Sequence, residues 1–162
     1  MMIPRVMEKM VSYFGHDTKR INHALKVFAF ARIISSREPL DAGMQDIIAY
    51  SALLHDIGIR EAERKYTSSS GKYQQIEGPP IARKILTDLG ISAPIIDRVC
   101  FITGNHHTYT KIDGIDFQII VEADFLVNIF EDDMAKEAIE SIGIRIFKTE
   151  AGKSLLRIMY LD

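Results

Sequence analysis

Residues 51–60 read SALLHDIGIR, and the two ionisable residues inside this stretch, His55 and Asp56, constrain how the chain can fold. The preceding residues are apolar at helical spacing, and the helical face that carries His55 also contains Met44, Ile47, Ile48 and Ser51. His55 is therefore expected to point into the interior. Burying an imidazole or a carboxylate without a partner costs free energy, so other parts of the chain must supply groups that compensate this pair.

The pattern on both sides of this stretch is helical almost throughout. Helices are predicted over residues 4–14, 18–36, 42–56, 79–89, 92–105 and 117–130, with two more between 133 and 162. Asp17 and Asp41 stand where N-caps are needed. Residues 59–77 are charged and Ser-rich and follow Gly58, so they are expected to form the longest loop. No alternation typical of strands competes, and the predicted class is all-α.

Composition sets the broad class of the protein. The chain has 162 residues, 47% of them hydrophobic, which predicts one compact domain with a sizeable core. The net charge of −2 gives no basic field, so no nucleic-acid partner is expected. Cys100 is the single cysteine, which excludes an intramolecular disulfide and fits a reducing compartment. No apolar run is long enough to span a bilayer, so a cytoplasmic protein without a membrane partner is expected.

Most of the histidines fall where the pattern predicts the interior. Four of the five lie on inward helical faces or at the inner ends of helices, and two carboxylates accompany them: His23, His55, His106, His107, Asp56 and Asp124. A single inward histidine is commonly a hydrogen-bonded core residue. Several buried ionisable groups are costly unless they compensate one another, and a divalent cation would compensate them together. Imidazole and carboxylate ligands suit Zn, Fe, Mn, Ni or Co.

The order of these residues resembles the HD superfamily of metal-dependent phosphohydrolases. His23 comes first, His55 and Asp56 follow within ALLHDIG, and Asp124 lies within VEADFLVN, so the resemblance covers residues 17–130. It implies an HD-domain-like helical bundle in which these four residues ligate a divalent transition metal. Residues 1–162 are then expected to form one HD-type domain, with the helices of 133–162 packed on its core.

Members of that superfamily with two metals use further histidines. His106 and His107, within ITGNHHTY, match the position of one such pair. The chain departs from the pattern in KYQQIEGPP, where another histidine would be expected, and Glu77 or, as the alternative, Gln74 is the candidate replacement. One or two metals per chain are therefore expected.

The resemblance also implies a reaction, namely hydrolysis of a small phosphate ester such as a nucleotide. The metal would lower the pKa of a bound water and present hydroxide to phosphorus, with Asp56 as the catalytic residue nearest to that water. Basic residues near the expected site are candidates for binding the substrate phosphate: Arg20, Lys26, Arg64, Lys65 and Lys72. Two alternatives stay open, a diiron oxygenase that needs a complete second metal site, and a non-catalytic sensor of metal or nucleotide.

Overall fold

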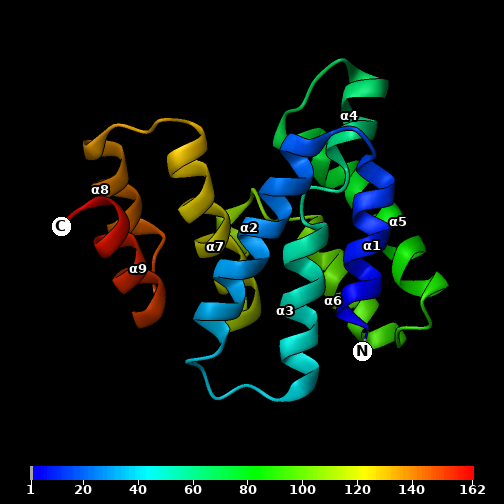
Figure 1. Cartoon of the computed structure of the whole chain (residues 1–162), viewed down its shortest axis with the longest axis horizontal. Coiled ribbons are helices and arrows are strands. Elements are labelled where there is room, and N and C mark those ends of the chain that lie inside the picture. The colour runs from blue at the N-terminus through cyan, green and yellow to red at the C-terminus, as the bar shows by residue number, and fades with distance from the viewer. Residues whose placement is uncertain (1) are drawn as a thin grey trace.

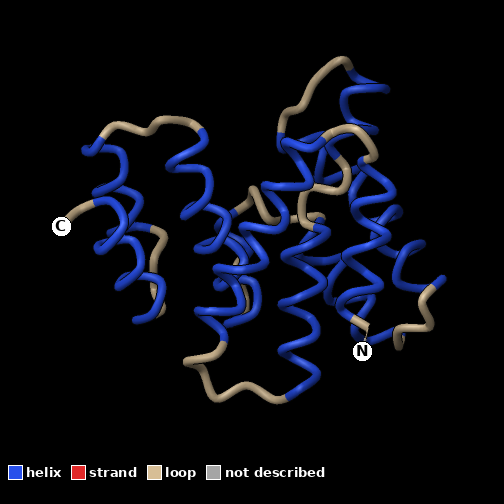
Figure 2. The backbone as a smooth tube through the Cα atoms, in the orientation of Figure 1, coloured by secondary structure: helices blue, strands red, loops and turns tan. Residues whose placement is uncertain are grey.

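Nine α-helices and a short 3-10 turn make up most of residues 2–162, the part of the chain that the computed structural model describes (Figure 1). In chain order the elements are α1 (Ile3–Phe14), α2 (Thr18–Ser35), α3 (Ala42–Leu54), α4 (Ile59–Tyr66), α5 (Gly71–Asp88), α6 (Ala93–Thr103), η1 (Tyr109–Lys111), α7 (Ile115–Glu131), α8 (Lys136–Arg145) and α9 (Glu150–Tyr160). No strand occurs between residues 2 and 162 (Figure 2), and the predicted all-α class is confirmed.

Side-chain caps begin α2 and α3 where the sequence predicted them. Asp17 accepts a hydrogen bond from the backbone N–H of Arg20 at 3.2 Å, and Asp41 accepts one from Met44 at 2.8 Å. Each cap satisfies a backbone donor that the first helical turn leaves without a partner. These two caps therefore fix the first residues of α2, which carries His23, and of α3, which leads to His55.

The predicted loop over residues 59–77 is wrong. The segment contains α4 and the first turns of α5, and the connection between these helices spans only 67–70. The helix predicted over 42–56 ends at Leu54, and Gly58, which was expected to end it, has a φ of −77° and directly precedes α4. In α4, Glu61 lies in the first turn and basic residues lie in the last, which is the favourable arrangement of charge along a helix.

The helix predicted to start at residue 79 begins instead at Gly71. Pro79 and Pro80 lie inside α5, although each removes one backbone hydrogen-bond donor. Because α5 packs against both α4 and α6, tertiary contacts hold the helix together across the two prolines. The proline pair is therefore internal to a helix rather than a marker of its start.

The centre of the bundle is α3, which packs against α1, α2, α6 and α7. It contributes Ile48 and Ala52 to a core cluster shared with α2 and α7, and Tyr50 and Leu53 to a second cluster shared with α1, α5 and α6. Every residue from 48 to 54 is buried. The end of α3 therefore brings His55 and Asp56 between the neighbouring helices.

The last two helices lie at one end of the molecule, beyond α7 (Figure 1). Glu122 of α7 is fully buried and accepts hydrogen bonds from the Thr149 backbone N–H at 2.9 Å and from the Thr149 hydroxyl. This carboxylate connects the start of α9 to α7, the helix that also carries Asp124.

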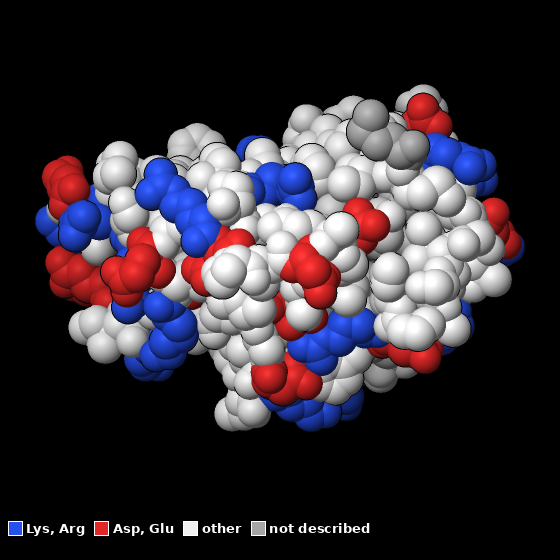
Figure 3. All heavy atoms as spheres, turned by 90° about the horizontal axis from the view of Figure 1, so that it is seen from below, with Lys and Arg blue, Asp and Glu red and all other residues white. Residues whose placement is uncertain are grey.

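Acidic and basic side chains are interspersed on the face of the molecule in Figure 3, which has no large area of a single sign. Within residues 2–162, none of the helices combines the length and the apolar character that crossing a bilayer requires.

Candidate metal centre

Three helices bring four predicted ligand residues together in what we call the primary cluster: His23, His55, Asp56 and Asp124. His23 Nε2 lies 3.2 Å from His55 Nε2 and 3.2 Å from Asp124 Oδ1. Asp56 Oδ2 lies 3.5 Å from His23 Nε2 and 3.6 Å from His55 Nε2. His55 is fully buried, whereas the Asp56 side chain is 21% exposed, so the cluster opens to solvent on the Asp56 side.

The hydrogen bonds behind the two rings determine which nitrogens carry protons. His55 Nδ1 donates to the carbonyl of Ala52 at 2.8 Å, and His23 Nδ1 donates to Glu131 Oε2 at 2.9 Å. In the neutral tautomer that each partner selects, the proton is on Nδ1 and Nε2 carries a lone pair. Two lone pairs then face each other at 3.2 Å beside two carboxylates, an arrangement that requires a proton or a metal cation between them.

The charges around the primary cluster favour positive charge within it. Burial alone would lower the pKa of His55, but the charges of Asp56 and Asp124 and a hydrogen bond to Asp124 raise it to about 9. Burial would raise the pKa of Asp124, but the protonated rings of His23 and His55, which donate to it through Nε2, hold that pKa well below its ordinary value. Two imidazole nitrogens and two carboxylates also form a donor set that suits a divalent transition metal, so the residues fit such an ion.

A secondary cluster, formed by Asp56, His106 and His107, adjoins the first. The ligand atoms of its three residues lie within 4.8 Å of one another. His106 Nδ1 donates to the carbonyl of Thr103 at 2.9 Å, which leaves the lone pair of Nε2 facing Asp56 Oδ1 at 3.1 Å. Asp56 therefore directs Oδ2 toward the primary cluster and Oδ1 toward the secondary cluster, which is the position of a bridging carboxylate.

Gln74, not Glu77, lies beside His107. Glu77 accepts hydrogen bonds from the Lys65 ammonium at 2.6 Å and the Tyr66 hydroxyl at 3.0 Å, and the Lys65 contact lowers the pKa of Glu77. Gln74 Oε1 lies 3.3 Å from His107 Nε2. Of the two candidate replacements for the absent histidine, the structure brings the neutral amide to the secondary cluster and pairs the carboxylate with α4.

His107 itself is held as a neutral ring. Burial lowers its pKa to about 4, and the charge of neighbouring His106 acts in the same direction. A neutral imidazole is the form that binds metals, so His107 needs no deprotonation to act as a ligand near neutral pH.

A hollow of about 230 Å³ opens from the primary cluster to solvent. Its walls are formed by Lys19, Arg20, His23, Asp56, Ile59, Ser69, Asn128, Glu131 and Asp132. Arg20 is among the five basic residues predicted to bind substrate, and it is shared between Asp17 at 2.5 Å and Glu63 at 2.6 Å. A phosphate reaching Arg20 must therefore compete with two carboxylates.

The other four predicted substrate-binding residues do not line this hollow, although Glu131, the partner of Lys26, does. Lys26 pairs with Glu131, Arg64 with Glu61, and Lys65 with Glu77. The Lys72 ammonium lies 5.6 Å from the centre of the Tyr73 ring. The structure thus keeps Arg20 at the hollow and gives each of the other four a different contact.

Sequence reasoning missed five polar residues that line the hollow: Lys19, Ser69, Asn128, Glu131 and Asp132. Lys19 lines the hollow, Asn128 donates to Asp124 Oδ1 at 2.9 Å, and Glu131 accepts from His23. Asn128 and Glu131 follow Asp124 by four and seven residues, a spacing that places all three on one face of α7. That spacing was the available signal, whereas the contact of Glu131 with His23 depends on how α2 and α7 cross.

Comparisons with known proteins bear on the fold. No protein-family model matches the chain, and no curated protein matches it. Among solved structures, a predicted HD superfamily hydrolase from an uncultured Thermotogales bacterium superposes with a TM-score of 0.71. The alignment covers 98% of this chain and 85% of that chain at 20% identity. The chain therefore has the HD-like all-α fold, and the neighbour supports the resemblance to the HD superfamily that the sequence indicated.

Proposed function

We propose that this protein is a metal-dependent phosphohydrolase that acts on a small phosphate ester. The observation that carries the proposal is the pair of Nε2 lone pairs of His23 and His55, which face each other at 3.2 Å between Asp56 and Asp124. Backbone and side-chain acceptors behind the rings fix this arrangement before any ligand arrives. The HD-like fold supports the same interpretation.

A divalent cation held by His23, His55, Asp56 and Asp124 would lower the pKa of a bound water and withdraw charge from a phosphoryl oxygen. Asp56 is the proposed catalytic residue, because its side chain is 21% exposed and lines the hollow, whereas the Asp124 side chain is 13% exposed. A carboxylate at the solvent edge can accept a proton from an attacking water and hold it there. Asn128 donates to Asp124, which keeps the latter oriented toward the rings.

The hollow indicates which part of a substrate would be enclosed. At about 230 Å³ it is smaller than the roughly 300–1,000 Å³ of pockets that enclose a whole small molecule. It suits the phosphoryl end of a substrate, with the remainder outside. Lys19 and Arg20 are the cationic side chains placed to stabilise negative charge on the transferred group.

We infer that a second cation, when bound, occupies the secondary cluster more weakly than the first. Asp56 is shared between the clusters, and Gln74 contributes a neutral amide where a charged ligand would offset more cation charge. With Gln74 in place of a charged ligand, the secondary cluster carries less negative charge, which favours one tightly bound metal per chain. A single metal favours hydrolysis over an oxygenase reaction that needs two irons.

Release of inorganic phosphate tests the proposed function. The protein is loaded separately with Mn²⁺, Fe²⁺, Co²⁺, Ni²⁺ or Zn²⁺ and screened against nucleotides and simple phosphate monoesters and diesters. We expect turnover with at least one metal, its loss on chelation, and its loss in Asp56→Ala. Turnover that survives both chelation and Asp56→Ala would contradict the proposal, and so would metal-loaded protein that is inactive across the whole panel.

A further inference from the structure

We propose that Glu131 is a positioning residue that holds His23 in the tautomer with a free Nε2, and that Lys26 makes a carboxylate necessary at position 131. The proposal rests on the metal-binding role given above to His23. It concerns the group behind the ring rather than the ligands themselves.

The contacts of Glu131 join the two helices that carry His23 and Asp124. Glu131 Oε2 accepts from His23 Nδ1 at 2.9 Å, and Glu131 Oε1 accepts from the Lys26 ammonium at 2.5 Å. The Glu131 side chain is 16% exposed, so water has limited access to replace either contact. One carboxylate therefore accepts from two different residues of α2, with one oxygen for each.

His23 differs from His55 and His106 in what lies behind its ring. His55 and His106 donate to the backbone carbonyls of Ala52 and Thr103, which belong to the same helical segments. A backbone carbonyl can only accept, so those two tautomers are fixed by the fold. The tautomer of His23 depends on a side chain from another helix, and therefore on the identity of residue 131.

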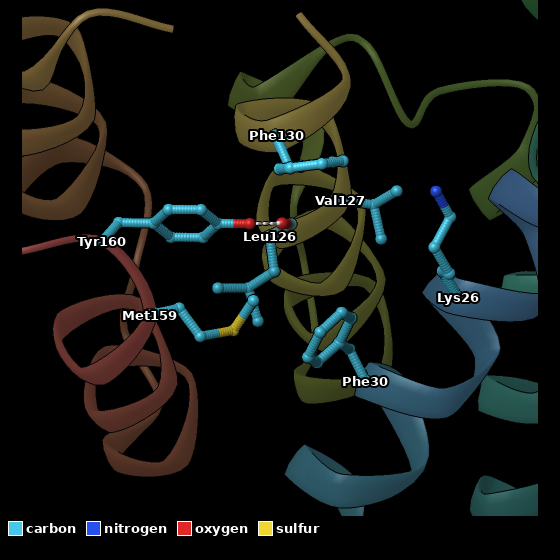
Figure 4. Close-up of a pocket in the computed structure, with 7 residues that line it drawn as sticks. All are labelled: Lys26, Phe30, Leu126, Val127, Phe130, Met159 and Tyr160. Atoms are coloured by element: carbon cyan, nitrogen blue, oxygen red, sulfur yellow. Dashed lines mark hydrogen bonds between the residues drawn. The ribbon is translucent and has the colours of Figure 1, made fainter. Parts of the chain in front are cut away.

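Because of Lys26, a glutamine at position 131 could not replace Glu131. Lys26 lies at the edge of an apolar groove of about 370 Å³ between α2, α7 and α9 (Figure 4), and its ammonium pairs with Glu131. A carboxylate has two acceptor oxygens, one for Lys26 and one for His23. A glutamine has one oxygen and one NH₂ group, and the charged ammonium would take the oxygen because charge-assisted hydrogen bonds are stronger.

The remaining NH₂ group of a glutamine at position 131 would then face His23 Nδ1. Because that group only donates, Nδ1 would have to accept, and the ring proton would move to Nε2. A proton on Nε2 occupies the lone pair that faces His55 and Asp124. The structure thus implies that a single amide substitution outside the ligand set switches His23 from a ligand to a non-ligand.

The zinc affinities of wild type, three variants and one control variant test this chain of contacts. Competition with a chromophoric chelator at one pH is measured for wild type, Glu131→Gln, Lys26→Met and the double variant, with Glu150→Gln as the matched control. Glu150 is a carboxylate whose side chain is 91% exposed and which pairs with Lys153 away from the site. Circular dichroism establishes that each variant retains its helices.

We expect Glu131→Gln to bind Zn²⁺ 10- to 100-fold more weakly, the range typical for the loss of a group that orients a metal ligand. Lys26→Met should retain most of the wild-type affinity, because Glu131 still accepts from His23. In the double variant the amide is free to turn its oxygen toward His23, so affinity should recover relative to Glu131→Gln. Long-range ¹H–¹⁵N spectra of the zinc-loaded wild type should show a protonated Nδ1 on His23.

The outcomes separate this proposal from the proposed function. Equal zinc affinity in wild type and Glu131→Gln would overturn the positioning role and leave the metal-dependent function standing. A double variant as weak as folded Glu131→Gln would overturn the role given to Lys26. Absence of binding of Zn²⁺, Mn²⁺, Co²⁺ and Ni²⁺ in both wild type and the Glu150→Gln control would overturn the proposed function, and the positioning role with it.

Discussion

Replacing Asp56 by asparagine removes one charge from the centre of both clusters while preserving side-chain volume. Asp56 Oδ2 lies 3.6 Å from His55 Nε2. At an effective dielectric constant of about 20, two unit charges at that distance attract by about 4–5 kcal/mol. One unit of pKa corresponds to about 1.4 kcal/mol, so loss of this charge should lower the pKa of His55 by about 3, from about 9 to about 6.

The same substitution removes a charged ligand from the proposed metal set. We expect the affinity for Zn²⁺ or Mn²⁺ to fall by at least about 100-fold, which equals roughly 2.8 kcal/mol at 1.4 kcal/mol per tenfold. Hydrolysis of an authenticated phosphate ester should be lost. The helices should persist, because asparagine keeps the volume of the side chain and removes a charge whose burial costs free energy.

Three measurements decide the outcome for Asp56→Asn: an NMR titration of the His55 ring in the metal-free protein, a metal competition assay, and phosphate release. Asp97→Asn is the matched control, since Asp97 pairs with Arg83 on the surface with its side chain 64% exposed. A His55 pKa that stays near 9, together with wild-type metal affinity and turnover, would refute the assignment of Asp56 as the shared carboxylate.

The remaining predictions concern pH, the secondary cluster and the close packing behind the site. The pKa of His55 is raised from 6.5 to about 9, so the stability it contributes is complete below pH 6.5 and is lost as pH rises through 9. Denaturation of chelator-treated protein should therefore show a free energy of unfolding lower by about 3 kcal/mol at pH 9.5 than at pH 6, and an increase would contradict the sign. Metal titration of the metal-free protein should show a tight and a looser event, and His106→Ala with His107→Ala should abolish the looser one; full stoichiometry in that double variant would leave one metal per chain as the correct description. Gly58→Ala should destabilise the fold by about 1–3 kcal/mol, because the new Cβ would clash with the Gln74 carbonyl oxygen and the backbone of Gly78. An unchanged denaturation midpoint would show that these two backbone segments can separate at no cost.

The sequence predicted those parts of the fold that depend on local signals. Apolar residues at helical spacing and the caps Asp17 and Asp41 predicted most helices, and the all-α class is confirmed. The charged segment after Gly58 was misread because α4 buries little of its surface, with Ala62 as its buried residue. The apolar residues of so short a surface helix are few, and charge placement and packing on α5 stabilise it.

The sequence could predict those residues of the candidate site that lie on inward helical faces, but not the contacts that depend on how the helices pack. His23 and His55 lie on inward faces, and the structure brings them together as expected. The partner of Glu77 could not be predicted, because Lys65 lies on the unpredicted helix α4. Glu131 was missed for a related reason, since its contact with His23 spans 108 residues of sequence and depends on the crossing of two helices.

The basic residues show a further limit of sequence reasoning. Charge near the predicted site suggested phosphate binding, but ion pairs between side chains decide which cations remain available. Lys26 pairs with Glu131 and Arg64 pairs with Glu61, whereas Lys19, which was not singled out, lines the hollow. Such pairings depend on side-chain reach between elements, which neither composition nor periodicity specifies.

The metal content of the purified protein tests the central claim most directly. Elemental analysis is made on protein never exposed to a chelator, and again after incubation with Mn²⁺, Co²⁺, Ni²⁺ or Zn²⁺ and removal of free ions. We expect at least one transition-metal ion per chain, reduced in a variant that carries both His23→Ala and His55→Ala. A near-zero metal content with no uptake of any of these ions would contradict the account. A proton, and not a metal ion, would then lie between Nε2 of His23 and Nε2 of His55.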